Sequence, residues 1–67
     1  MSEHRLRVGW PPYLRTLTAG LEALGIAYEV ERTAPDARTL VWSATAEQHA
    51  EWRALVLPSL ARLRAGT

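Results

Sequence analysis

The segment from Thr45 to Ala65 is the longest amphipathic stretch of the chain, and any fold must bury its apolar side. Apolar residues recur there at spacings of three and four, which is typical of a helix with one buried face. Thr45 and Gln48 match a capping box, in which each side chain bonds the backbone amide of the other. We therefore predict a helix over residues 45–65. Its apolar stripe comprises Trp52, Leu55, Val56, Leu60 and Leu63.

Two residues inside this helix depart from the pattern. Pro58 cannot bond the carbonyl of Ala54, which costs ~3 kcal/mol unless the helix bends. We expect a kink there, or two shorter helices. Leu57 projects away from the apolar stripe, between Arg53 and Arg64. It is either a single exposed leucine, which is common in proteins, or a contact with another subunit or a partner.

Three shorter segments alternate between apolar and polar residues, as half-buried strands do. They span residues 5–10, 26–32 and 39–43, and we expect residues 1–4 to form a flexible end. Turn-forming residues around Pro35 and Asp36 join the last two segments, which predicts an antiparallel hairpin. The residues expected to point inward are Leu6, Val8, Trp10, Ile26, Tyr28, Val30, Leu40, Trp42 and Ala44.

A second helix is predicted over residues 13–24, followed by Gly25 as its stop. Gly20 lies at the edge of its apolar face, where the missing side chain would allow another element to approach closely. The order is strand, helix, strand, strand, helix. Because the sheet and both helices each have one apolar face, we predict an α+β two-layer sandwich. A three-stranded sheet would carry two helices on one face, in a single domain over residues 1–67.

The size and composition favour association with a second chain. A chain of 67 residues buries only about 60% of its unfolded surface, which leaves it marginally stable alone. There is no cysteine to add a disulfide or a thiolate metal site, although 48% of the residues are apolar. We therefore expect a homodimer. No apolar run is long enough to cross a membrane and no signal peptide is recognisable, so the expected location is the cytoplasm.

The outer face of the sheet is the first candidate for binding a partner. With both helices on one side, the other side would display arginines on the first strand and glutamates on the second, which can pair across the sheet. This face is either a solvated sheet surface or a dimer or partner surface. The candidate partner-binding residues are Arg5, Arg7, Glu29, Glu31, Val41 and Leu57.

No catalytic or metal-binding constellation is recognisable, so we expect a protein that is not an enzyme and has no cofactor. His4 lies in the expected flexible end, and His49 stands alone at the margin of the helical stripe. Glu47 and Glu51 are four residues apart on a helix, with no further ligand nearby, which is typical of a solvated face. The chain also lacks a nucleophile motif and a glycine-rich phosphate loop.

Nucleic acid is the alternative partner. The net charge of +1 provides no general attraction to phosphate, and the aromatic residues fall on faces assigned to the core. The one basic strip runs along the last helix, and its candidate residues are Arg53, Arg62 and Arg64.

The junction Ser43-Ala44-Thr45-Ala46-Glu47-Gln48, together with the order of elements, resembles the small DinI-like modulators of the DNA-damage response. The resemblance implies the same α+β layout and a role in modulating a protein assembly. That family engages a recombinase filament through a strongly acidic last helix. Here the last helix has two glutamates followed by three arginines, so the feature that carries the family's function is absent.

The sequence as a whole favours a non-catalytic protein-binding module, an adaptor, inhibitor or modulator of a larger assembly. Its size is also typical of proteins from phages and mobile elements. The expected partner is a protein, including a second copy of the chain, and no membrane is expected to take part.

Overall fold

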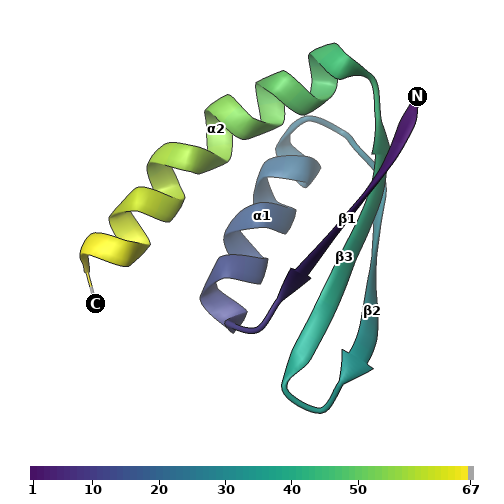
Figure 1. Ribbon diagram of the computed structural model, residues 1–67. Helices are drawn as coiled ribbons and strands as arrows, with labels where there is room; N and C mark the ends of the chain where they lie inside the picture. The colour runs from purple at the N-terminus through teal and green to yellow at the C-terminus, as the bar shows by residue number, and fades with distance from the viewer. Residues whose placement is uncertain (67) are drawn as a thin grey trace.

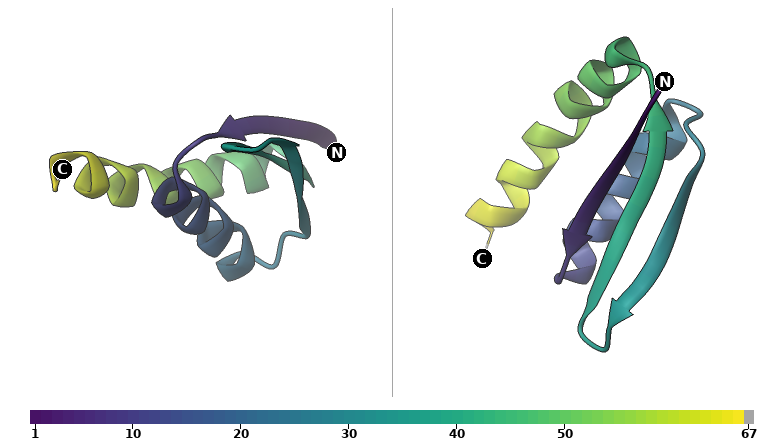
Figure 2. Two further views of the ribbon diagram at one scale, coloured as in Figure 1. Left: turned by 90° about the horizontal axis from the view of Figure 1, so that it is seen from below. Right: turned by 45° about the vertical axis from the view of Figure 1, so that its right-hand side comes forward.

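The strand β3 (Ala37–Ala44) is the centre of a three-stranded antiparallel sheet. In the computed structural model, which describes residues 1–66, β1 (Ser2–Val8) pairs with one side of β3 and β2 (Tyr28–Ala34) with the other. The helices α1 (Pro11–Ala23) and α2 (Ala46–Ala65) lie on the same side of this sheet (Figures 1 and 2). The predicted α+β architecture and its β-α-β-β-α order are confirmed.

The sheet is covered well at its centre and poorly at its two edges. Leu40 on β3 lies between Leu6 on β1 and Val30 on β2, and all three point to the helix side. Leu40 is completely buried, whereas Leu6 is 42% exposed and Val30 is 43% exposed. Their inward direction is as predicted. Their burial is incomplete because two helices cannot span three twisted strands to both edges.

The first strand is shifted toward the N-terminus relative to the prediction. Ser2 pairs with Ala44 and His4 with Trp42, so residues 2–4, which lie in the expected flexible end, belong to β1. His4 continues the alternation of Leu6 and Val8, but a histidine is a weak signal of an inward position. Trp10 lies outside the strand, as the residue that precedes α1, and its exposed ring meets Tyr13 edge-on.

Local sequence signals specify the start of α2 and the end of α1. The Thr45 hydroxyl accepts from the Gln48 amide at 3.1 Å, and the Gln48 side chain accepts from the Thr45 amide at 2.9 Å, which confirms the capping box. Gly25 follows α1 with a φ of 70°, a left-handed conformation that glycine adopts without strain. Neither helix within residues 1–66 is long and apolar enough to cross a membrane.

The helix α2 runs through Pro58 as one element, so the alternative of two separate helices is wrong. Pro58 and Ala54 are both exposed. Water can therefore bond the carbonyl that the proline leaves unpaired, and the ring does not disturb the core.

The two helices cross in direct contact at Gly20. A methyl group at this position would collide with a γ-carbon of Val56 and would lie 3.2 Å from the Trp52 ring. The Trp52 indole donates to the carbonyl of Leu17 at 3.0 Å, which ties α2 to α1 inside the core. The predicted close approach at Gly20 is confirmed. The core comprises Val8, Leu17, Leu21, Ile26, Leu40, Trp42, Ala44, Trp52 and Val56.

Replacing Gly20 with alanine tests this contact. Alanine has the better helix propensity by ~1 kcal/mol, but its methyl group meets Val56, whose branched side chain has one strongly preferred rotamer in a helix. We expect G20A to lower the free energy of unfolding by roughly 1–3 kcal/mol, measured by urea denaturation. The control A19G, at an exposed position of the same helix, should lose only the ~1 kcal/mol of propensity. A stabilised G20A protein would show that the crossing is looser than described.

Candidate functional site

The outer face of the sheet is an ion-paired polar surface. Arg5 Nη1 donates to Glu31 Oε1 at 3.4 Å across the central strand, and Arg5 Nη2 lies 3.8 Å from Glu3 Oε1. One predicted arginine–glutamate pair across the sheet is therefore present, between Arg5 and Glu31. Val41 lies on this face as expected, between Arg5 and Glu29, but only 9% of it is exposed. This face consequently offers a partner little apolar surface.

Leu57 on α2 is 51% exposed, in keeping with its predicted position outside the apolar stripe. Leu55 differs from its prediction, because it is 46% exposed. It lies over a shallow groove between the helices, where Ala19, Gly20 and Ala23 of α1 are too small to cover it. Two leucines of α2 thus face solvent on different sides of the helix.

The three arginines of α2 proposed as a basic strip are all exposed. Arg62 donates to the Ser59 hydroxyl of the same helix at 3.2 Å, so it is partly engaged locally. Arg38, at the base of the β2–β3 hairpin, donates to the carbonyls of Ala34 and Ala37 and stabilises the turn. Arg38 thus lies on β3, apart from the three arginines of α2.

A groove of about 420 Å³ opens between β1, the first half of α1 and Leu60 in the C-terminal half of α2. It exists because α2 diverges from the sheet beyond its crossing with α1, as both figures show (Figures 1 and 2). Its lining is largely apolar and includes Leu6, Trp10, Tyr13, Leu17 and Leu60. Sequence reasoning missed this groove, since it combines residues that were each assigned to the core.

The groove lies beside an open strand edge. β1 bonds β3 through its whole length, from Ser2 to Val8, and no strand within residues 1–66 pairs with its other side. An edge of this kind presents unpaired amide and carbonyl groups that another extended chain can bond. Strand edge and apolar groove together form what we call the β1 surface, defined by Ser2–Val8, Trp10, Tyr13, Leu17 and Leu60.

A cluster of four rings closes the opposite end of β1. His4 of β1 and His49 of α2 stack in nearly parallel planes with centroids 4.2 Å apart. Trp42 stacks on His4 at 5.3 Å, and Trp52 lies 5.6 Å from His49. Nδ1 of His49 is buried and has no hydrogen-bond partner among the described residues. His49 therefore packs inside a ring cluster, together with His4, which the sequence placed in a flexible end.

This packing disfavours a charge on His49. Burial lowers the pKa of His49 from its ordinary value of 6.5, and the positive charges of His4 and Arg53 lower it further. The folded state thus binds a proton at His49 less readily than the unfolded state does. Above the pKa that His49 has in the unfolded chain, His49 is neutral in both states and folding is not opposed. As the pH falls below that pKa, the unfolded chain binds a proton at His49 more readily than the folded chain does, so the free energy of unfolding decreases.

The pH dependence of stability tests the ring cluster. Between pH 7.5 and 5.5 we expect the free energy of unfolding, measured by urea denaturation, to fall in the wild-type protein. H49Q should show a smaller fall, because glutamine does not titrate, and a lower stability at pH 7.5 through lost ring packing. E47Q, an exposed change in the same helix, is the control and should retain the wild-type slope. Equal slopes for wild type and H49Q would contradict a depressed His49 pKa.

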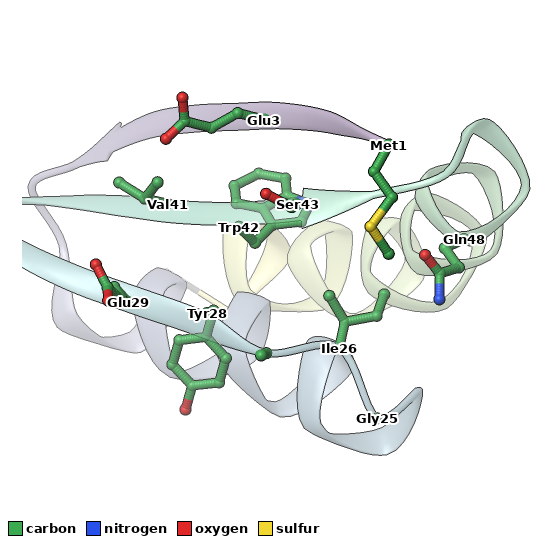
Figure 3. Close-up of a pocket in the computed structure, with 11 residues that line it drawn as sticks. Met1, Glu3, Gly25, Ile26, Tyr28, Glu29, Val41, Trp42, Ser43 and Gln48 are labelled. Atoms are coloured by element: carbon green, nitrogen blue, oxygen red, sulfur yellow. The ribbon is translucent and has the colours of Figure 1, made fainter.

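A wider depression of about 620 Å³ lies at the end of the sheet where β2 begins (Figure 3). Met1, Ile26 and Gln48 gather at one end of it, and the carboxylates of Glu3 and Glu29 lie at the other. No group of three or more His, Cys, Asp or Glu side chains that could hold a metal ion occurs among residues 1–66. The depression combines apolar side chains with two carboxylates, the Ser43 hydroxyl and the Gln48 amide.

Comparison with known proteins found no match for this chain among family models, curated proteins or solved structures. The resemblance to DinI-like modulators rests on the order of elements and on the junction from Ser43 to Gln48. The functional inference depends on the chain's own surfaces.

Proposed function

We propose that the protein is a non-catalytic protein-binding module, an adaptor or modulator of a larger assembly, which binds through its β1 surface. The observation that carries this proposal is the juxtaposition of an open strand edge with an apolar groove. A bound chain can satisfy backbone hydrogen bonds along β1 while it places apolar side chains against Leu6 and Trp10. Strand addition of this kind obtains its affinity from main-chain bonds and its specificity from side-chain pockets.

The chemistry of this surface suits protein better than phosphate or a small substrate. Its groove is lined mainly by apolar side chains, and the charges beside it, on Glu3, Arg5 and Arg7, are of both signs. Such a mixture favours backbone bonding and apolar contact over attraction to a polyanion. The outer face of the sheet and Leu57 lie outside the groove and are secondary contacts in this proposal.

Capture with purified variants tests the proposal. The immobilised protein is exposed to nuclease-treated extract of its host, and bound proteins are identified by mass spectrometry. L6E places a charge in the groove and should reduce capture at least about tenfold, since a buried unpaired charge is strongly unfavourable. V30E is the matched control, because Val30 occupies the equivalent position on the other edge strand with nearly equal exposure. Equal capture by both variants would exclude the β1 surface.

The nuclease step addresses the alternative, in which Arg53, Arg62 and Arg64 bind nucleic acid. The exposure of these three arginines along α2 supports it. Binding of that kind should weaken steeply as salt rises, because neutralised phosphates release counterions. Substituting the three arginines by glutamine should then abolish binding, whereas L6E should leave it unchanged.

A further inference from the structure

We infer that the occupant of the β1 edge is a second copy of this chain, whose own β1 pairs antiparallel with the first. The two sheets would join into one continuous sheet with three strands from each copy. This inference rests on the proposed function, because it names the protein that binds at the same surface. It is carried by the order of charges along β1 and by the direction in which α2 leaves the sheet.

The charges of β1 complement themselves in one antiparallel register. Glu3, Arg5 and Arg7 occupy alternate positions and so share the outer face. When Arg5 stands opposite Arg5 of the second copy, Glu3 faces Arg7 and Arg7 faces Glu3. Opposite charges directly across an antiparallel pair are stabilising. The two central arginines are tolerated because each already lies near Glu31, at 3.4 Å, and Glu3, at 3.8 Å, of its own chain.

The neighbouring registers are less favourable. A pair centred on Leu6 sets Arg5 against Arg7, which repel each other. A pair centred on His4 matches Glu3 with Arg5, but it leaves Arg7 opposite Met1 and shortens the ladder. Only the register centred on Arg5 pairs every residue of β1, from Ser2 to Val8, with another residue of β1.

The other sheet edge lacks these properties. The outer face of β2 carries Glu29 and Glu31, so pairing this strand with itself brings carboxylates together. The pairing of β2 with β3 is also irregular between Glu31 and Ala34, and irregular edges discourage strand addition. Pairing through β1 alone gives a closed two-fold dimer and no filament.

On the helix side, β1 borders the apolar groove lined by Leu6, Tyr13, Leu17 and Leu60. In Figure 2 the C-terminal half of α2 runs away from the sheet on the side where β1 lies. In the proposed register, Leu6 of the second copy lies opposite His4, on this same side. The added strand thereby covers apolar surface that α1 and α2 leave open, including the 42% exposed side chain of Leu6.

A single engineered cysteine tests the register. The chain has no cysteine, so R5C introduces a unique thiol at the two-fold axis. Residues directly opposite in an antiparallel pair have β-carbons about 4.5–5.5 Å apart, within reach of a disulfide after small adjustments. We expect R5C to form a disulfide-linked dimer under mild oxidation. E29C is the matched control, because Glu29 flanks Val41 from the other edge, and it should remain uncrosslinked.

Charge reversal tests the ion pairs independently. E3R and R7E each replace two attractive contacts by two repulsive ones, and each should raise the dimer Kd, measured by sedimentation equilibrium, about tenfold or more. The double variant E3R/R7E exchanges the charges and should restore a Kd near that of the wild type. Circular dichroism establishes that each variant is folded. Failure of the double variant to restore association would overturn the register.

The outcomes separate this inference from the proposed function. A wild-type protein that stays monomeric up to millimolar concentration, with no R5C crosslink, overturns the second copy as occupant. If host capture still distinguishes L6E from V30E in that case, the protein-binding function stands and the occupant is a different protein. If capture fails as well, both proposals fail. If the molar mass from sedimentation equilibrium exceeds that of a dimer and E29C also forms a disulfide crosslink, both sheet edges associate. That result overturns the closed dimer in favour of edge-to-edge assembly.

Discussion

The contact between α1 and α2 at Gly20 determines the arrangement of the whole molecule. Without a side chain at this position, Val56 and Trp52 reach the backbone of α1, and the Trp52 indole bonds the Leu17 carbonyl. Because this contact lies near the middle of α2, the preceding turns pack over the sheet and the following turns leave it. The same contact that fills the core thus creates the groove beside β1. A side chain at position 20 would move α2 outward and change both.

The uneven cover of the sheet follows from that arrangement. Two helices that touch each other bury the central strand, so Leu40 is completely inaccessible while its neighbours on both edges stay about two-fifths exposed. The two edges then differ in what surrounds them. β1 borders an apolar groove and carries charges of both signs, whereas the outer face of β2 carries two carboxylates and its pairing is interrupted near the hairpin. The β1 edge is therefore a better site for association than the β2 edge.

The sequence predicted the architecture well because local signals and hydrophobic periodicity agree throughout the chain. The capping box at Thr45, the stop at Gly25 and the alternation in β3 each specify their own element. The order of the strands in the sheet could not be predicted, because the residue pattern of one strand does not show whether that strand lies at the centre or at the edge. Exposure also depends on neighbours: Leu55 satisfies the helical period but stands over alanines and a glycine of α1. The β1 surface could not be predicted, because it arises from the divergence of elements that each look buried.

Charged residues on an edge strand usually prevent pairing with another chain, and Glu3, Arg5 and Arg7 are charged residues on an edge strand. Protection works best when the charges have one sign, because a register that pairs charged positions then sets like charges against each other. The two glutamates on the outer face of β2 follow that rule. β1 does not, since a glutamate and an arginine placed symmetrically about Arg5 attract their counterparts in a second copy.

The small size of the chain also favours association. A domain of 67 residues without a disulfide has little stability in reserve, and covering the exposed side chain of Leu6 would add apolar burial that the monomer lacks. The order of charges along β1 and the small size of the chain therefore favour pairing of β1 with a second copy over protection of β1 against pairing.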